Sequence, residues 1–81
     1  MKKMAWNLPI IVEDPDTGAP RTVSTVRQAQ SVLHDHWPDT SGSRYRAAEA
    51  ACDGAMHGET EGETARKAFI DAAIEAHLHL G

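Results

Sequence analysis

The sequence predicts a single α+β domain in which an N-terminal β-hairpin packs on three α-helices. Residues 4–12 alternate apolar with other side chains, which is the period-2 pattern of a strand with one buried face. Three later segments repeat apolar residues every three or four positions, as amphipathic helices do. The last of them, residues 61–76, has two adjacent apolar faces. It is therefore expected to lie between the sheet and another helix.

The composition indicates a soluble domain that spans residues 1–81. Hydrophobic residues make up 41% and charged residues 25% of the 81 positions, which is ordinary for a globular protein. The net charge of -4 disfavours nucleic-acid binding, because such domains usually present a basic surface. Cys52 is the only cysteine, so no internal disulfide can form. No segment approaches the roughly 18 apolar residues of a membrane span, and we expect a cytoplasmic protein.

The hairpin is predicted from two strands and the turn between them. The first strand has apolar residues of one parity, namely Met4, Trp6, Leu8, Ile10 and Val12, and Trp6 and Ile10 are expected in the core. Pro9 lacks an amide hydrogen, so this strand should lie at an edge, or the Pro9 position should face away from the partner strand. Residues 14–18 contain the Pro and Gly of a tight turn, and residues 21–23 return as the second strand.

The first helix is predicted to begin at Val26. Thr25 and Gln28 have the spacing of a capping box, in which each side chain bonds the backbone near the other residue. Pro38 ends the helix at or just before Trp37. Its apolar stripe contains Val26, Ala29, Val32, Leu33 and Trp37.

The second helix follows a polar loop, residues 39–43, whose serines can cap it. Its apolar stripe is Tyr45, Ala48, Cys52, Ala55 and Met56. Gly58 is expected as a left-handed residue just after its end. Gly54 is expected about opposite the stripe, away from the core.

Residues 60–63 have the pattern of another capping box, which predicts that the last helix begins at Glu61. One face of this helix should contain Phe69, Ala65, Ala72, Ala73 and Ala76, a second face Ile70 and Ile74, and the solvent side Lys67, Asp71 and Glu75. Residues 77–80 alternate strictly. We expect them to form a short third strand over residues 78–80, with continued helix as the alternative.

Several blocks of the chain together resemble a known family: Trp6 before a short apolar strand, residues 33–38, Tyr45 with Ala48 and Cys52, and residues 65–73. They are similar to a small alphaproteobacterial family of uncharacterised proteins, domain of unknown function 982. The resemblance implies a compact bacterial, cytoplasmic α+β domain, and it implies no activity, cofactor or catalytic residue. At His77 the family pattern usually has a glycine after the helix.

The histidines and the cysteine raise the possibility of a metal site. The candidate ligands lack the spacing of a structural or catalytic zinc site, so we expect no cofactor and no metal; they are His34, His36, Cys52, His57, His77 and His79. Cys52 is expected to pack as a small apolar residue with a raised pKa. Because no nucleophile, phosphate-loop or metalloprotease motif is present, the chain is expected not to be an enzyme.

Arg66 is the residue with the clearest pair of alternatives. Its position falls between the two apolar faces of the last helix, so its guanidinium needs a partner. In the structural interpretation it binds helix-end carbonyls or the second-helix carboxylates of Glu49 or Asp53. In the functional interpretation it forms an anion site with Arg44 and Arg46.

The leading functional hypothesis is a small non-catalytic interaction or regulatory module, and the alternative is a small-ligand or anion-binding domain centred on Arg66. Trp37 is either a core residue, which we favour, or an exposed binding anchor. Ile11 should lie on the face opposite Trp6 and Ile10. We expect an unknown protein partner, or a weak homodimer that uses the first strand.

Overall fold

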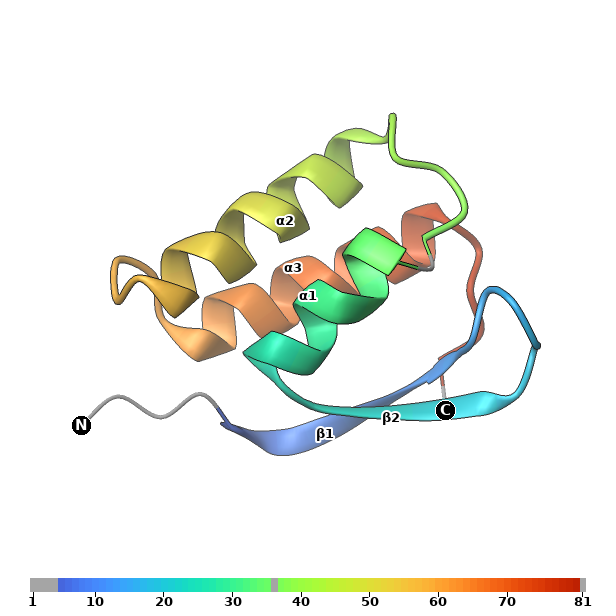
Figure 1. The fold of residues 1–81 in the computed structure, drawn as a ribbon, viewed down its shortest axis with the longest axis horizontal. Coiled ribbons are helices and arrows are strands. Elements are labelled where there is room, and N and C mark those ends of the chain that lie inside the picture. Colours follow the sequence, from blue (N-terminus) through green and yellow to red (C-terminus); the bar gives the residue numbers. More distant parts are fainter. Residues whose placement is uncertain (1–4, 36, 81) are drawn as a thin grey trace.

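The computed structural model describes residues 5–35 and 37–80 and shows a hairpin below three helices (Figure 1). The elements are β1 Ala5–Glu13, β2 Pro20–Thr25, α1 Val26–Asp35, α2 Ser43–Met56 and α3 Gly62–Glu75. β1 and β2 form a two-stranded antiparallel sheet, and the helices lie on one of its sides. The predicted α+β fold with an N-terminal hairpin and three helices is confirmed. None of the described helices is long and apolar enough to cross a membrane.

β1 contains an irregularity that the alternating pattern did not reveal. Five steps along β1, from Ala5 to Ile10, face two steps along β2, from Thr25 to Val23, so β1 accommodates three extra residues there. Trp6 and Ile10 are buried as predicted. Leu8 shares their parity but is 66% exposed, so its expected place on the buried face is wrong. Extra residues interrupt the strict alternation of a strand, and parity therefore fails within this segment.

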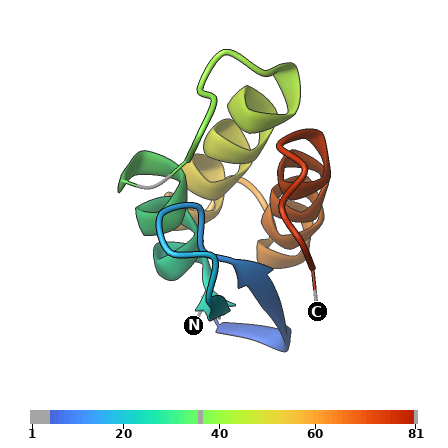
Figure 2. The ribbon, with the colours of Figure 1, turned by 90° about the vertical axis from the view of Figure 1, so that its right-hand side faces the viewer.

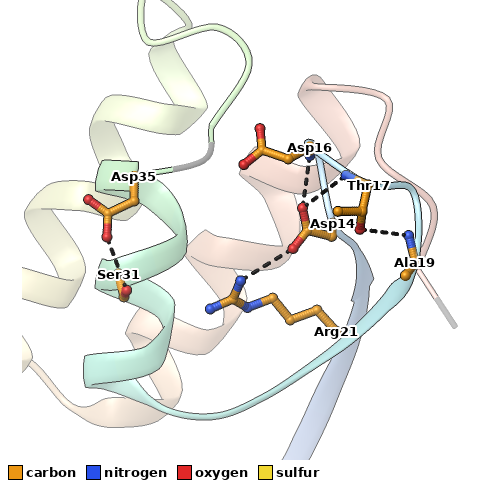
Figure 3. Close-up of polar contacts among 7 residues, drawn as sticks. All are labelled: Asp14, Asp16, Thr17, Ala19, Arg21, Ser31 and Asp35. Carbon is orange, nitrogen blue, oxygen red and sulfur yellow. Dashed lines mark hydrogen bonds and ion pairs between the residues drawn. The ribbon is translucent and has the colours of Figure 1, made fainter.

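The hairpin turn is held by the side chain of Asp14 (Figure 3). Its Oδ1 accepts hydrogen bonds from the amides of Asp16, at 2.8 Å, and Thr17, at 3.3 Å. Its Oδ2 lies 3.3 Å from Nη1 of Arg21 on β2. Gly18 has φ 78°, a conformation in which a β-carbon is strained. The turn predicted at residues 14–18 is thus confirmed.

The core lies between the sheet and the helices and is centred on aromatic rings. The ring of Phe69 on α3 lies 6.1 Å from that of Trp6 on β1 and 5.5 Å from that of Trp37, which follows α1. Trp37 in turn lies 6.3 Å from Tyr45 on α2. The three aromatic contacts join β1, α2, α3 and the loop after α1 into one cluster of buried residues.

The capping box of α1 forms as predicted. The amide of Gln28 donates to Oγ1 of Thr25 at 3.1 Å, and the helix begins at Val26. The Gln28 side chain reaches back one residue further than the standard pattern, because its Oε1 accepts from the amide of Ser24 at 2.7 Å.

The N-terminus of α2 is capped by a residue 31 positions away along the chain, and the predicted serine cap is wrong. Gly42 occupies the N-cap position without a side-chain bond. The two carboxylate oxygens of Glu75 accept from the amides of Arg44 and Tyr45, each at 3.2 Å. Since α2 and α3 run antiparallel, the end of α3 lies beside the start of α2 (Figure 1). Glu75, which was expected only to face solvent, therefore caps α2.

Gly54 is buried at the end of α2, which contradicts its predicted place away from the core. A β-carbon at this position would collide with Oγ1 of Thr60. Thr60 thus packs over α2, and α3 begins at Gly62 with Glu61 as an N-cap that lacks a side-chain bond, so the second capping box is wrong. The amides of Gly58 and Glu59 donate to the Ala55 and Gly54 carbonyls at 3.2 and 2.8 Å. This pair of bonds is a Schellman motif, and Gly58 has the expected positive φ of 80°.

α3 ends in a second Schellman motif whose left-handed residue is not glycine. The amides of His77 and Leu78 donate to the carbonyls of Ile74 and Ala73 at 3.0 and 2.9 Å. His77 has φ 60°, so it occupies the left-handed conformation that glycine adopts most readily. Ile74 is 60% exposed, which contradicts its place on a second apolar face.

Residues 78–80 continue as an extended segment rather than as helix. Leu80 forms an isolated antiparallel bridge with Val12, and the Glu13 amide donates to the His79 carbonyl at 2.8 Å. A single bridge does not make a strand, and no third strand is found within residues 5–35 and 37–80. The extended conformation expected for residues 78–80 is thus present, but the prediction that they form a third strand is wrong.

Candidate functional site

Arg66 connects α3 to the irregular segment of β1. Its Nε donates to the carbonyl oxygen of Leu8 at 2.8 Å, and its Nη1 lies 3.4 Å from Oε2 of Glu63, one turn earlier on α3. The side chain is 18% exposed, so its stem is packed while its charged end is bonded. The carbonyl partner belongs to a strand rather than a helix end, and the carboxylate partner is Glu63 rather than one on α2.

The structure does not bring the three arginines of the hypothetical anion site together. Arg44 lies at the start of α2, where its amide bonds Glu75. Arg66 precedes Glu75 by nine residues on α3, which corresponds to about 13 Å along a helix axis. Arg46 lines a different surface, the groove between α1 and α2. The three arginines therefore lie at three different places on the described part of the fold.

The groove between α1 and α2 has a volume of about 310 Å³ and is lined by Gln30, His34, Arg46, Glu49, Ala50 and Asp53. Oε2 of Glu49 lies 3.1 Å from Nε2 of His34 and 3.3 Å from the Tyr45 hydroxyl. The Tyr45 hydroxyl also lies 3.2 Å from the Leu33 carbonyl oxygen, so its one proton is shared between this carbonyl and Glu49. Burial and the neighbouring Glu49 charge raise the pKa of Tyr45. The carboxylate thus serves to join the two helices.

The other candidate metal or catalytic groups do not converge. His57 lies at the end of α2, where its Nδ1 is 2.8 Å from the Asp53 carbonyl oxygen. Cys52 is fully buried, and burial raises the pKa of its thiol to about 11. Across the described ranges 5–35 and 37–80, no three His, Cys, Asp or Glu side chains are arranged to hold a metal. His36 lies outside the described residues.

The two residues suggested for an interaction surface have opposite environments. Trp37 is only 8% exposed and lies among the core rings, so it does not present its indole to a partner. Ile11 is 43% exposed. It lies one residue from buried Ile10 and Val12, and hence on the opposite face of β1, as predicted.

Ile11 borders a shallow, mainly apolar pocket of about 290 Å³. We call this surface the outer hairpin face, and its lining residues are Ile11, Val12, Glu13, Gly18, Pro20 and His79. Both strands and the segment after α3 contribute to it. The sequence pattern placed Ile11 here, but it gave no indication that His79 would complete the pocket from the far end of the chain.

Both edges of the hairpin carry groups that hinder further strand pairing. On β1 the amide of Glu13 points away from β2 and bonds His79, and the Leu8 carbonyl is bonded by Arg66. On β2 the amide of Ser24 is bonded by Gln28, and Pro20 has no amide hydrogen to offer. The sequence did not indicate which groups of β1 these bonds would involve, because each bond joins residues more than 55 positions apart.

Comparison with known proteins gives a family but no activity. Residues 8–80 match the family model described as protein of unknown function (DUF982). No curated protein and no solved structure matches the chain significantly. The matched range includes β2, the three helices and the segment that returns to β1. The chain therefore belongs to the DUF982 family.

Proposed function

We propose that this protein is a small, non-catalytic interaction module of the bacterial cytoplasm whose contact surface is the outer hairpin face. The observation that carries the proposal is the exposure of Ile11, 43%, beside the apolar pocket. Exposed apolar side chains around a concave surface are typical of contact sites. Neighbouring Pro20 adds apolar area, and its ring has little conformational entropy to lose on binding.

The chemistry of the reactive groups supports a non-catalytic function. A thiol with a pKa of about 11 is protonated at neutral pH and is a poor nucleophile. Glu49 already bonds His34 of α1 and Tyr45 of its own helix, α2. These groups stabilise the packing of two helices, and neither is poised beside an activated partner.

The proposed occupant of the outer hairpin face is a second copy of the chain in a weak homodimer. As long as the groups on both hairpin edges keep their bonds, addition of a strand is unfavourable, so we propose contact through side chains of the sheet face. The net charge of -4 opposes assembly beyond a weak complex.

Sedimentation over a concentration series tests this proposal. The parent protein should shift towards dimer at high concentration, and Ile11→Glu should abolish the shift. Ile74→Glu is the matched control, because Ile74 is also exposed, at 60%, but lies on α3 outside the pocket. A parent that stays monomeric to millimolar concentration, or a dimer that depends on Ile74 instead, would contradict the homodimer. Capture from a native extract of a protein that binds the parent and Ile74→Glu but not Ile11→Glu would then assign the face to a different partner.

Small-anion binding is the second candidate function, and the observation in its favour is Arg46 beside His34 in the α1–α2 groove. Titration with inorganic phosphate, followed by NMR of the Arg46 and His34 signals, tests it. Saturable shifts that disappear in Arg46→Ala would support the site. Unchanged spectra up to about 10 mM phosphate would exclude this site, because a dissociation constant above that value is too weak to be useful.

A further inference from the structure

The segment after α3, residues 76–80, occupies a place that a partner strand could take. We call it the C-terminal tail; it descends from α3 to the outer edge of β1 (Figure 2). The Glu13 amide donates to the His79 carbonyl at 2.8 Å, and the His79 amide donates to Oε1 of Glu13 at 3.1 Å. Leu80 bridges Val12 in antiparallel orientation. The tail therefore imitates the pairing that an added β-strand would make.

The tail is held by few contacts. Leu78 and Leu80 are only partly buried against the core, and His77 and His79 are exposed. β2, on the other side of β1, pairs at five positions of the register. Segments with few buried contacts open more readily than the core. The tail is thus the weakest-held neighbour of β1.

The residue that joins the tail to α3 is in an unfavourable conformation. His77 has φ 60°, and this left-handed conformation is unfavourable for any residue that has a β-carbon. Gly58 occupies the equivalent position after α2, at φ 80°, without that cost. The strain at His77 can be relieved only when the bond from the Leu78 amide to the Ala73 carbonyl opens as well, so it favours release of the tail from residue 77 onward.

Release would free an acceptor and a donor beside an apolar surface. The amide of Glu13 would lose its partner, and its carboxylate would be available to accept a backbone N–H. Ile11 shares the parity of Glu13, so its backbone groups also point to this edge. The tail shows which chemistry fits here: an extended backbone with apolar side chains at alternate positions, as at Leu78 and Leu80.

We propose that the C-terminal tail is a displaceable strap, and that an extended partner segment with alternating apolar residues replaces it on β1. The strand-pairing site adjoins the outer hairpin face, whose pocket includes Glu13 and His79, but it would bind a partner through backbone groups of β1 rather than through the Ile11 side chain. Closed, the strap protects the edge from unselective pairing. Open, it offers the Glu13 amide to a partner backbone.

Amide hydrogen exchange tests whether the tail opens by itself. The Glu13 amide should exchange roughly a hundredfold faster than that of Val23, which is paired with Ile10 inside the hairpin. His77→Gly should slow exchange at Glu13 by roughly fivefold to tenfold, because it removes the strain. Gly58→Ala is the control: it should speed exchange at Val23 and leave Glu13 nearly unchanged. Equal exchange rates at Glu13 and Val23 in the parent would overturn the strap.

A peptide with the sequence of residues 76–81 tests whether a partner segment can take the site. Leu80→Ala should weaken the attached tail, and the peptide supplies the missing leucine. Titration of this variant should give saturable NMR shifts at the Glu13 amide, and His77→Gly should give smaller shifts than the parent. An absence of peptide-dependent shifts in Leu80→Ala would overturn the partner site. These readouts do not depend on Ile11, so they fail or succeed separately from the homodimer experiment.

Discussion

The cap that α3 supplies to α2 makes a specific energetic prediction for Gly42. A β-carbon at Gly42 would collide with the Glu75 carboxylate, whose oxygens bond the amides of Arg44 and Tyr45. Gly42 itself has φ -69° and ψ 146°, so alanine can adopt its backbone conformation. Gly42→Ala should therefore act by displacing the carboxylate, and its effect should depend on whether Glu75 is present.

The magnitude follows from the bonds that are lost. Removal of an N-cap interaction costs about 0.5–2 kcal/mol, and loss of a negative charge at a helix N-terminus about 0.3–1 kcal/mol. Glu75→Ala should thus lower the free energy of unfolding by about 1–3 kcal/mol. Gly42→Ala should lose most of the same interaction. It regains about 0.4–1 kcal/mol because alanine has less freedom than glycine in the unfolded chain.

Urea denaturation monitored by the fluorescence of buried Trp6 and Trp37 measures both effects. In the Glu75→Ala background, Gly42→Ala should no longer destabilise and should show only its gain of about 0.4–1 kcal/mol, because no carboxylate remains to be displaced. Asp71→Ala, an exposed change on the same helix, should alter stability by less than about 0.5 kcal/mol. Additive costs of the Gly42 and Glu75 changes would refute the reasoning, since residues that share one interaction are not additive.

Three further predictions concern Arg66, the residues that end α2 and α3, and Cys52. Arg66→Ala should lower the free energy of unfolding by about 1–3 kcal/mol, because the Leu8 carbonyl loses its donor, and Arg66→Lys should lose only part of that stability. Urea denaturation that shows the parent and both variants to be equally stable would contradict this. His77→Gly should raise the free energy of unfolding by about 1 kcal/mol, and Gly58→Ala should lower it by a similar amount. Thermal melts in which His77→Gly is less stable than the parent, or Gly58→Ala more stable, would contradict the left-handed conformation of these residues. The pKa of buried Cys52 is about 11, whereas an unfolded thiol has a pKa of about 8.5, so the unfolded chain loses this proton first. The free energy of unfolding should therefore fall as pH rises between these two values. If Cys52→Ala shows the same decline, the thiol is not its cause.

Features set by neighbouring residues could be predicted from the sequence. The Asp14 turn and the capping box of Thr25 and Gln28 each form within a few positions, and both are present. The burial of Trp6 and the exposure of Ile11 follow from the pleat of a strand. Such features depend on local backbone geometry, which the order of residue types largely determines.

Features that depend on how elements meet could not be predicted. Thr60 fits a capping box locally but packs against Gly54 instead, because α2 ends directly beneath it. Leu8 is displaced by extra residues in β1, which a pattern of alternating residues cannot reveal. Arg66 needed a partner, yet the choice of Leu8 follows from the position of α3 beside β1. The long-range bonds, rather than the helix and strand assignments, therefore define the candidate surfaces.

The contact of α3 with β1 also sets the order in which the fold can be completed during synthesis. β1 emerges from the ribosome first, but its buried Trp6 packs on Phe69 and its Leu8 carbonyl bonds Arg66, and both partners are synthesised later as part of α3. A two-stranded hairpin is marginal in water by itself. At about 5–20 residues per second, the hairpin and α1 therefore spend several seconds without the surface that covers them. Chaperone binding to the nascent chain should consequently be strongest before α3 appears and should decline once that helix has emerged.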